Sequence, residues 1–400
     1  MDNTERKVLV LNPYLPTLGG GEKHMGYLCQ FIEEYWENVT IDILVHDYNE
    51  VDIHADDYVT IEKINKQFDL SLKHTNIRRL DLVKGGGIRN NLKNKKMVED
   101  ITKEYDLFVN FMFLSKHIGK AKVNLYECMF PPKRFAVELH GFMKKLGGRV
   151  LDYLFYRSYD VYISNSFYTN HWLSTFWKNT DKNTTIYPPV FWKKEIVGRY
   201  DEKKKKNIII SVGRFFVAAH SKKQLELVKI FVNHQDVFSG YEYHLVGAVS
   251  NLPRDVEYLN EIKRIASTVN NVFVHENYPY GKLIDLYAQA KIFWHATGYM
   301  VDENKEPEKM EHFGITTVEA MSFGAVPVVI NKGGQKETVA PGENGYLWDT
   351  EEECVEQTRK LIEDDHLRRE MAENSAERAN SYSIDEFYEA NRRLFHEKGL

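Results

Sequence analysis

Short apolar segments alternate with helical patterns twice along the chain, and this alternation limits the folds that the chain can adopt. Strands separated by helices form parallel sheets with right-handed crossovers, so each half is predicted to be a doubly wound α/β domain. Near the end of the second half, the valine-rich run 325–330 is typical of a strand buried on both faces. Strands are predicted at 8–12, 40–46, 107–113 and 161–165 in the first half and at 207–213, 243–247, 272–275, 292–296 and 326–330 in the second.

The boundary between the two halves is predicted from a proline turn and a basic, poorly periodic stretch, YPPVFWKKEIVGRYDEKKKKN. The 400 residues also exceed what one hydrophobic core normally serves. We predict a first domain at 1–195, a linker at 196–206, a second domain at 207–380 and a terminal helix at 381–400, with Ser383 as its N-cap. The lysine run 203–206 is expected to be a solvated face of the linker.

Charge and cysteine content narrow the class of protein. The 53 Lys and Arg nearly balance the 58 Asp and Glu, which gives no indication of a nucleic-acid partner. Three cysteines that lack metal-binding spacing suit a reducing cytoplasm. The polar start leads directly into the first strand, and no apolar run is long enough to span a bilayer. These features predict a cytoplasmic protein.

The segment EHFGITTVEAMSFG, residues 311–324, places Glu311 and Glu319 on either side of a predicted helix start. The free N–H groups of a helix start favour an anion, usually phosphate, and Gly314 lets the backbone approach it closely. Carboxylates would repel phosphate but accept hydrogen bonds from sugar hydroxyls, so the segment favours a ligand that contains sugar, phosphate and ribose. For Glu319, a capping box with Thr316 stays open as the alternative. Gly324 is predicted to end the helix.

Cationic residues follow the first strand of the second half. Arg214 comes directly after this strand, and Lys222 and Lys223 lie where the next helix begins. Cations at a helix N-terminus oppose the helix dipole unless an anion lies between them, and a diphosphate is the simplest such anion. Solvated surface lysines are the alternative.

Three successive glycines, residues 19–21, follow the first strand of the chain and open a helix near Glu22. Glycines at such a turn allow a ligand to approach the backbone, although a tight turn without a ligand would also explain them. The pattern is neither G-x-G-x-x-G nor a P-loop, so no dinucleotide or nucleoside-triphosphate fingerprint is predicted.

Taken together, several motifs resemble the retaining nucleotide-sugar glycosyltransferases of family 4. The motifs are GGGEK, SNSFYTNHWL, IYPPV, SVGRFF with HSKKQ, and EHFGITTVEAMSFGAVPVV, with Glu311 and Glu319 in the E-x7-E spacing of that family. The resemblance implies the GT-B fold, in which two Rossmann-like domains face each other across a cleft. The segments YPPV and EHFGI are similar to the branch of α-mannosyltransferases that act on lipid-linked glycans and polysaccharides. GDP-mannose is therefore the favoured donor, and UDP-sugars stay open.

The resemblance also implies roles for individual residues. Glu311 would meet hydroxyls of the transferred sugar, Glu319 would hold the ribose, and Arg214 with Lys222 would neutralise the diphosphate. No D-x-D pair is present, so we expect a retaining transfer without metal or further cofactor, in which the leaving phosphate helps to deprotonate the acceptor. The other donor-binding residues implied are Gly20, Gly21, Lys223, Val274, His312, Phe313, Gly314 and Ile315.

On the acceptor side the sequence departs from the family pattern. Met129 stands before Phe130 and Pro131 where many relatives have a histidine, so either another group, such as His140, supplies the missing sugar contact or the contact is absent. Asn165 and Ser166 of the SNSF motif are the other residues implied on this side.

The stretch 129–160 of the first half mixes basic and apolar residues. It is either an interfacial patch that contacts a membrane carrying a lipid-linked glycan, or a half-buried helix with a solvated basic face. Two other functions remain as alternatives for the whole chain. One is a GT-B epimerase or phosphorylase, and the other is a sugar-nucleotide-binding protein without activity.

Overall fold

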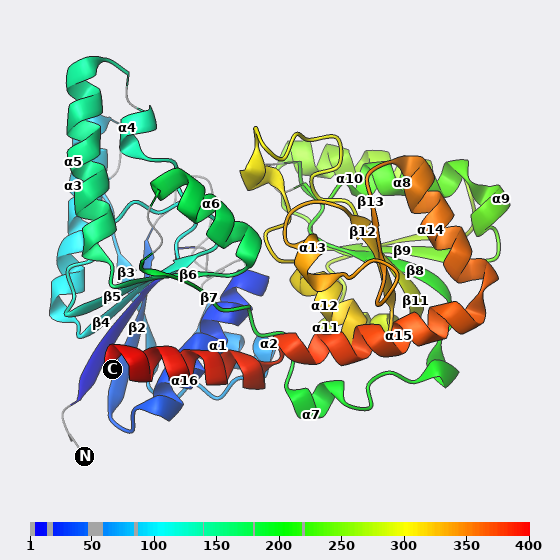
Figure 1. The fold of residues 1–400 in the computed structure, drawn as a ribbon, viewed down its shortest axis with the longest axis horizontal. Coiled ribbons are helices and arrows are strands. Elements are labelled where there is room, and N and C mark those ends of the chain that lie inside the picture. Colours follow the sequence, from blue (N-terminus) through cyan, green and yellow to red (C-terminus); the bar gives the residue numbers. More distant parts are fainter. Residues whose placement is uncertain are drawn as a thin grey trace. The chain divides into compact units, whose positions relative to one another are not determined.

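The computed structural model describes residues 5–13, 19–46, 59–83, 87–138, 140–178, 181–217 and 221–400. The chain divides into two compact units. We call them the N unit, which contains Met1–Pro189 and Tyr388–Leu400, and the C unit, which contains Val190–Phe387. Each contains one parallel sheet with helices on both faces (Figure 1). The predicted pair of doubly wound α/β domains is therefore confirmed.

The N unit is built on a seven-stranded sheet with the order β3-β2-β1-β4-β5-β6-β7, in which every pairing is parallel. On one face, Phe155 of α5 packs with Tyr126, Tyr159 and Tyr162. The elements are β1 (Arg6–Leu11), α1 (Gly20–Tyr35), β2 (Val39–His46), α2 (Ile61–Phe68), β3 (Thr75–Leu80), α3 (Ile88–Ile101), η3 (Thr102–Glu104), β4 (Leu107–Asn110), β5 (Val123–Cys128), α4 (Phe135–Glu138), α5 (Phe142–Ser158), β6 (Val161–Ser164), α6 (Phe167–Trp177) and β7 (Asn183–Thr185).

The C unit is built on a six-stranded parallel sheet with the order β10-β9-β8-β11-β12-β13. Its core is centred on Trp294 of β11, whose Nε1–H donates to Thr358 Oγ1 at 3.0 Å. The elements are α7 (Lys193–Ile196), η4 (Glu202–Lys204), β8 (Lys206–Val212), α8 (Gln224–Asn233), α9 (Gln235–Phe238), β9 (Glu242–Gly247), α10 (Pro253–Ala266), β10 (Val272–Glu276), α11 (Tyr280–Gln289), β11 (Ala290–His295), η5 (Pro307–Lys309), α12 (Ile315–Ser322), β12 (Val326–Ile330), α13 (Gln335–Thr338), β13 (Tyr346–Trp348), α14 (Glu351–Glu363), α15 (Asp365–Ala379), η6 (Asn380–Tyr382) and α16 (Ile384–Lys398).

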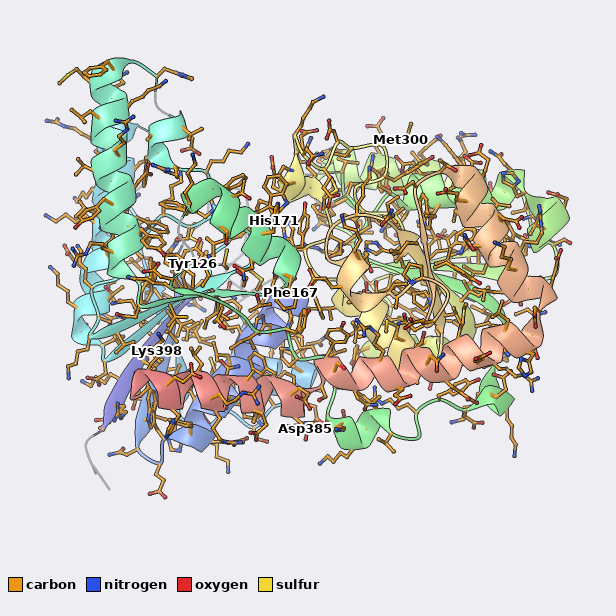
Figure 2. All side chains as sticks on the ribbon, viewed as in Figure 1. Tyr126, Phe167, His171, Met300, Asp385 and Lys398 are labelled. Atoms are coloured by element: carbon orange, nitrogen blue, oxygen red, sulfur yellow. The ribbon has the colours of Figure 1, made fainter. Side chains whose placement is uncertain are left out.

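The last helix, α16, starts among residues of the C unit and ends among residues of the N unit. Figure 2 labels Asp385 near its beginning and Lys398 at its end. The predicted N-cap is confirmed, because Ser383 Oγ accepts the Glu386 N–H at 3.3 Å. Within the N unit, the rings of Tyr388 and Phe395 pack against Phe31 of α1 at centroid distances of 5.4 and 5.2 Å. The end of α16 thus forms part of the N unit core.

The expectation of a fully solvated lysine run is wrong for Lys205. Its Nζ donates to the Ala290 carbonyl oxygen at 2.6 Å. Burial, reinforced by the charge of Arg368 and opposed by Glu202, lowers the pKa of Lys205 to about 7. Lys203, Lys204 and Lys206 are exposed as expected.

Candidate functional site

The candidate site of the C unit lies where β8, β11 and β12 end. The direction in which the chain crosses the sheet reverses between β8 and β11. From β8 the chain proceeds to β9 and β10 on one side, and it then returns to add β11, β12 and β13 on the other side. In open α/β sheets, ligands bind outside the carboxyl ends of the strands at such a switch point. The loops after β8 and β11, together with α12, supply every C unit residue of the predicted site except Val274.

Two of the predicted cationic residues follow β8. Lys222 lies over Gly213, because a Cβ on this glycine would come within 2.6 Å of the lysine Cγ. Gln224 fixes the turn by donating from Nε2 to the carbonyl oxygens of Gly213 and Arg214. The Arg214 guanidinium lies 5.0 Å from the ring centre of Phe216. In the part of the chain that the structure describes, no carboxylate pairs with Arg214, so its charge is available to an anion.

Glu311 is held by two partners from different strand ends. Lys222 Nζ lies 2.5 Å and His295 Nε2 3.1 Å from the same oxygen, Glu311 Oε2. Burial alone would raise the pKa of Glu311, but the Lys222 charge and the two hydrogen bonds outweigh it and hold this pKa well below its usual range. Glu311 is therefore a carboxylate that can only accept hydrogen bonds, as sugar hydroxyls require.

The backbone from Glu311 to Gly314 is fixed by a glycine turn after β12. The Gly334 N–H donates to the Glu311 carbonyl oxygen at 2.8 Å. A Cβ on Gly333 would lie 2.1 Å from this same oxygen, so no other residue fits there. Gly314 is the N-cap of α12 with φ of 101°, and a Cβ on it would come within 2.7 Å of Gln335 Nε2. The space that a Cβ would need at Gly314 is thus taken by the Gln335 side chain, and the close approach of a ligand to this backbone stays a prediction.

The capping-box alternative for Glu319 is wrong. Helix α12 begins at Ile315 after Gly314, so Thr316 already lies inside the helix and no side chain caps its start. Glu319 is 7% exposed, and Tyr287 of α11 donates to its Oε2 at 3.4 Å. The Gly324 prediction is confirmed. Its φ is 74°, and the N–H groups of Gly324 and Ala325 return to the carbonyls of Met321 and Ala320, as in a Schellman motif.

The other predicted donor residues have distinct environments. Phe313 is buried, and its ring packs edge-on against Tyr382 at 5.3 Å, so a ligand can meet only its backbone. His312 is also buried, while Ile315 is half-buried at the first position of α12. Lys223 adopts a left-handed backbone as the N-cap of α8 and pairs with Glu226 at 3.3 Å. Val274 is in the middle of the edge strand β10, where one side of the backbone has no neighbouring strand in the sheet.

In the N unit, the glycine turn lies beside the residue that departs from the family pattern. Helix α1 begins at Gly20, two residues earlier than expected, and Glu22 Oε2 accepts the Gly19 N–H at 2.7 Å. A Cβ on Gly21 would lie 3.4 Å from Met129 Cε. Asn165 also approaches this methionine, with its Nδ2 3.9 Å from Met129 Sδ.

Two of the acceptor-side residues have other surroundings. Ser166 is fully buried and caps α6, because its Oγ accepts the Thr169 N–H at 3.0 Å. His140 is exposed in the loop between α4 and α5. Among the described residues, no hydrogen bond or ring contact joins His140 to Met129 or Asn165, so nothing in the described contacts supports it as the replacement histidine.

Two polar residues at or next to the ends of buried strands were not predicted from the sequence, His295 and Glu127. His295 is the last residue of β11, and a polar residue that ends an apolar strand, as in IFWHA, could have drawn attention to it. Glu127 of β5 is 2% exposed, and its Oε1 has no hydrogen-bond partner among the described residues. Burial raises its pKa to about 8. A carboxyl group with a strongly shifted pKa beside Met129 is a candidate functional group.

Comparisons with known proteins relate parts of this chain to glycosyltransferases. Residues 193–378 match the family described as "Glycosyl transferases group 1". The α-1,3/1,6-mannosyltransferase ALG2 of Rhizomucor pusillus is 28% identical over 204 residues, which are 46% of this chain and 44% of that protein. A GDP-Man:Man(3)GlcNAc(2)-PP-Dol alpha-1,2-mannosyltransferase of Homo sapiens is 25% identical over 241 residues, 58% and 46% of the two chains. The matches thus span less than half the length of these curated relatives.

Solved structures resemble the whole chain. Anabaena Alr3699/HepE in complex with UDP and glucose has a TM-score of 0.68 at 16% identity, covering 98% of this chain and all of the other. The pneumococcal O-GlcNAc transferase GtfA in complex with UDP and GlcNAc has a TM-score of 0.67 at 10% identity, covering 99% of each chain. The two Rossmann-like units and these neighbours define a protein with the GT-B fold. The match over residues 193–378 is more specific, because it relates this part of the chain to the glycosyl transferases group 1 family.

We predict that His295→Leu destabilises the protein by about 2 kcal/mol at pH 7.5, because Glu311 loses a hydrogen bond to a charged group. Burial, reinforced by the Lys222 charge, lowers the pKa of His295 from 6.5, although Glu311 opposes this shift. The unfolded chain therefore binds the proton more readily than the folded chain, so the wild type loses stability as the pH falls below 6.5. Leucine does not titrate, so the gap in Tm should narrow toward pH 5. His295→Gln, which keeps a donor, should be closer to the wild type at pH 7.5. Equal Tm values for the two variants would show that His295 does not hold Glu311.

We predict that Glu127→Gln has the opposite dependence on pH. The unfolded chain loses the Glu127 proton near 4.5 and the folded chain only at about 8, so the wild type loses stability as the pH rises between these values. Glutamine removes this loss. Thermal unfolding should show equal Tm values at pH 5 and a variant more stable at pH 9, by on the order of 2–4 kcal/mol.

A matched control for Glu127 is Glu99→Gln. Glu99 is also buried, but Lys95 and Lys120 lie 3.7 Å from its carboxylate, so its loss should destabilise the protein at neutral pH. If Glu127→Gln instead destabilised the protein at pH 9, Glu127 would have to be an ionised group with a cationic partner.

Proposed function

We propose that the protein is a retaining glycosyltransferase that moves a hexose, with mannose favoured, from a nucleotide-diphosphate sugar to a hydroxyl of a glycan or lipid-linked acceptor. The observation that carries this proposal is the contact of Lys222 with Glu311 at the switch point of the C unit sheet, with Arg214 in the same loop as Lys222 directly after β8. The family match over residues 193–378, which includes all three residues, supports the same function. Mannose is favoured because the two curated relatives cited above are mannosyltransferases.

In the proposed reaction, the bond between the anomeric carbon and the donor phosphate breaks, and negative charge develops on the departing diphosphate. Arg214, Lys222 and the free N–H groups at the start of α12 stabilise this charge. Lys222 has three N–H donors, so it can keep its contact with Glu311 while another N–H meets a phosphate oxygen. These groups provide the electrostatic stabilisation without a metal ion.

Glu311 positions the sugar in this proposal. Lys222 and His295 share its Oε2, which leaves Oε1 to accept hydrogen bonds from hydroxyls of the transferred sugar. The same two partners lower its basicity, and this disfavours Glu311 as a covalent nucleophile. The acceptor oxygen therefore attacks on the face that the phosphate leaves, and its proton passes to a phosphate oxygen. The configuration of the anomeric carbon is retained.

A thermal-shift panel of GDP, UDP, ADP and their sugars tests the donor. A ligand at a hundred times its Kd should stabilise the protein by about 2.7 kcal/mol. We expect the largest shift with GDP and GDP-mannose. A shift with UDP compounds alone would replace mannose by a UDP-sugar, a donor class suggested by the UDP in two solved structures. No shift with any of them would contradict the proposal.

In an assay of sugar transfer from the donor that the panel identifies, Arg214→Ala should lower turnover by about a hundredfold or more with an unchanged Tm. Arg214 is the cleaner choice, since removing Lys222 would also leave the buried Glu311 without its cation. Arg359→Ala is the matched control, because this half-buried arginine of α14 pairs only with Glu356 among the described residues. Normal turnover of the Arg214 variant would remove the diphosphate role of Arg214. If the wild type bound the nucleotide-sugar but showed no turnover, the protein would be a sugar-nucleotide-binding protein without transferase activity.

We predict that Glu319→Gln raises the KM for the donor about tenfold, because a neutral amide makes weaker hydrogen bonds to ribose hydroxyls than a carboxylate does. The Tm should barely change, since Glu319 does not cap α12. Glu353→Gln is the control. Glu353 belongs to the capping box of α14, and its change should leave KM unaffected. An unchanged KM for the Glu319 variant would exclude the ribose contact.

A further inference from the structure

Helix α5 exposes an unusual amount of apolar surface. Six of its apolar side chains are 47–82% exposed, and we call them the outer stripe: Phe142, Met143, Leu146, Val150, Tyr153 and Leu154. Val137 of the neighbouring helix α4 is a further 65% exposed. In Figure 1, α5 runs along the edge of the N unit next to α4. Contiguous apolar surface of this kind marks an interaction site.

The outer stripe is opposite to the side that holds α5 to the N unit. At about 100° per residue, the six side chains fall within an arc of roughly 120° on the helix. The three buried residues of α5, Gly148, Asp152 and Phe155, centre on the opposite side. One side of α5 therefore packs against the N unit, and the opposite side is exposed.

Specific contacts fix this orientation. The Asp152 carboxylate accepts the N–H groups of Phe135 and Ala136, at 2.7 and 3.3 Å, and contacts Arg134 Nε at 3.2 Å. A Cβ on Gly148 would lie 2.8 Å from the backbone nitrogen of Ala136, so α4 and α5 are in direct contact. On the same side, the ring of Phe155 packs against Trp177 at 4.9 Å. These contacts hold α5 rigidly with its stripe outward.

Positive charge borders the outer stripe. Helix α5 contains four exposed cations, Lys144, Lys145, Arg149 and Arg157, against one acidic residue, Asp152, which is buried. The whole chain has a net charge of −5, so this helix is a basic exception on an acidic protein. On the helix, Lys145 and Arg149 flank one edge of the stripe and Lys144 lies beyond the other, while Arg157 falls within the arc of the stripe and donates to the Tyr153 hydroxyl at 2.7 Å.

We propose that the outer stripe of α5 inserts into the headgroup region of an anionic lipid membrane, while the flanking lysines and arginines contact lipid phosphates. An apolar face bordered by cations is the signature of a helix that lies in the membrane interface. A second copy of the chain fits less well, because two such stripes in contact would bring eight cations together. In the described residues, no helix is long and apolar enough to cross a membrane. The exposed apolar stripe thus favours the interpretation of residues 129–160 as a membrane-contacting patch over that of a half-buried helix with a solvated basic face.

Sedimentation of the full chain with vesicles tests the proposal. We expect binding to vesicles of phosphatidylcholine mixed with phosphatidylglycerol, and little binding to phosphatidylcholine alone. The variant Phe142→Ser/Met143→Ser/Leu146→Ser should bind at least about tenfold more weakly, since three apolar side chains no longer insert. The variant Lys144→Gln/Lys145→Gln/Arg149→Gln should lose about a hundredfold, because each cation near an anionic surface contributes about fivefold.

The matched control is Val197→Ser/Leu252→Ser/Met300→Ser, which changes three apolar side chains of the C unit that are 42–79% exposed. It should bind like the wild type. Each altered side chain is exposed, so every variant should keep its Tm within a few degrees. Failure of the wild type to bind anionic vesicles, or equal binding by the stripe variant, would overturn the proposal. Concentration-dependent dimers that the stripe variant cannot form would instead identify a second copy as the occupant.

Discussion

The contact of Lys222 and His295 with Glu311 ties together three segments of the C unit that are far apart in the sequence. A carboxylate that is largely removed from solvent stays charged only with a cation and hydrogen bonds beside it, so each partner depends on the others. The strand order brings them into reach, because β8 and β11 are neighbours and their ends meet at one edge of the sheet. The Gly333–Gly334 turn then holds the backbone of Glu311, and a side chain on Gly333 would collide with the Glu311 carbonyl oxygen. Charge, strand order and glycine packing therefore depend on one another at this point.

The sequence predicted the architecture because parallel strands buried on both faces are apolar throughout. The nine strands expected are all present, whereas β3, β5, β7 and β13 were missed for physical reasons. Strand β7 and strand β13 have three residues each, too few to show a period. Strand β3, TNIRRL, is a half-exposed edge strand, and β5, VNLYEC, buries a polar Asn124 and Glu127 that a pattern based on apolar residues cannot recognise.

The site was predictable where a single segment defines it and not where distant segments meet. The E-x7-E spacing and the residues after β8 could be read from sequence, as could the turn at Gly324. The pairing of Lys222 with Glu311 spans 89 residues, and His295 joins it from a third segment. At Glu319, the spacing within a single segment suggested an alternative that the structure contradicts. Thr316 and Glu319 have the spacing of a capping box, but the glycine before Ile315 lets the helix begin earlier and leaves that box without a function.

The path of α16 has a consequence for how the protein folds during synthesis. Residues 388–400 complete the N unit, yet the ribosome makes them only after the whole C unit. Until then, Phe31 and Tyr35 of α1 lack the ring of Phe395, so an apolar surface stays open on the first unit while the second is being made. An N-terminal domain usually completes its folding before the next domain is synthesised, but here the N unit can be completed only after the C unit has been synthesised. The nascent N unit is the part of this chain that a chaperone would have to protect.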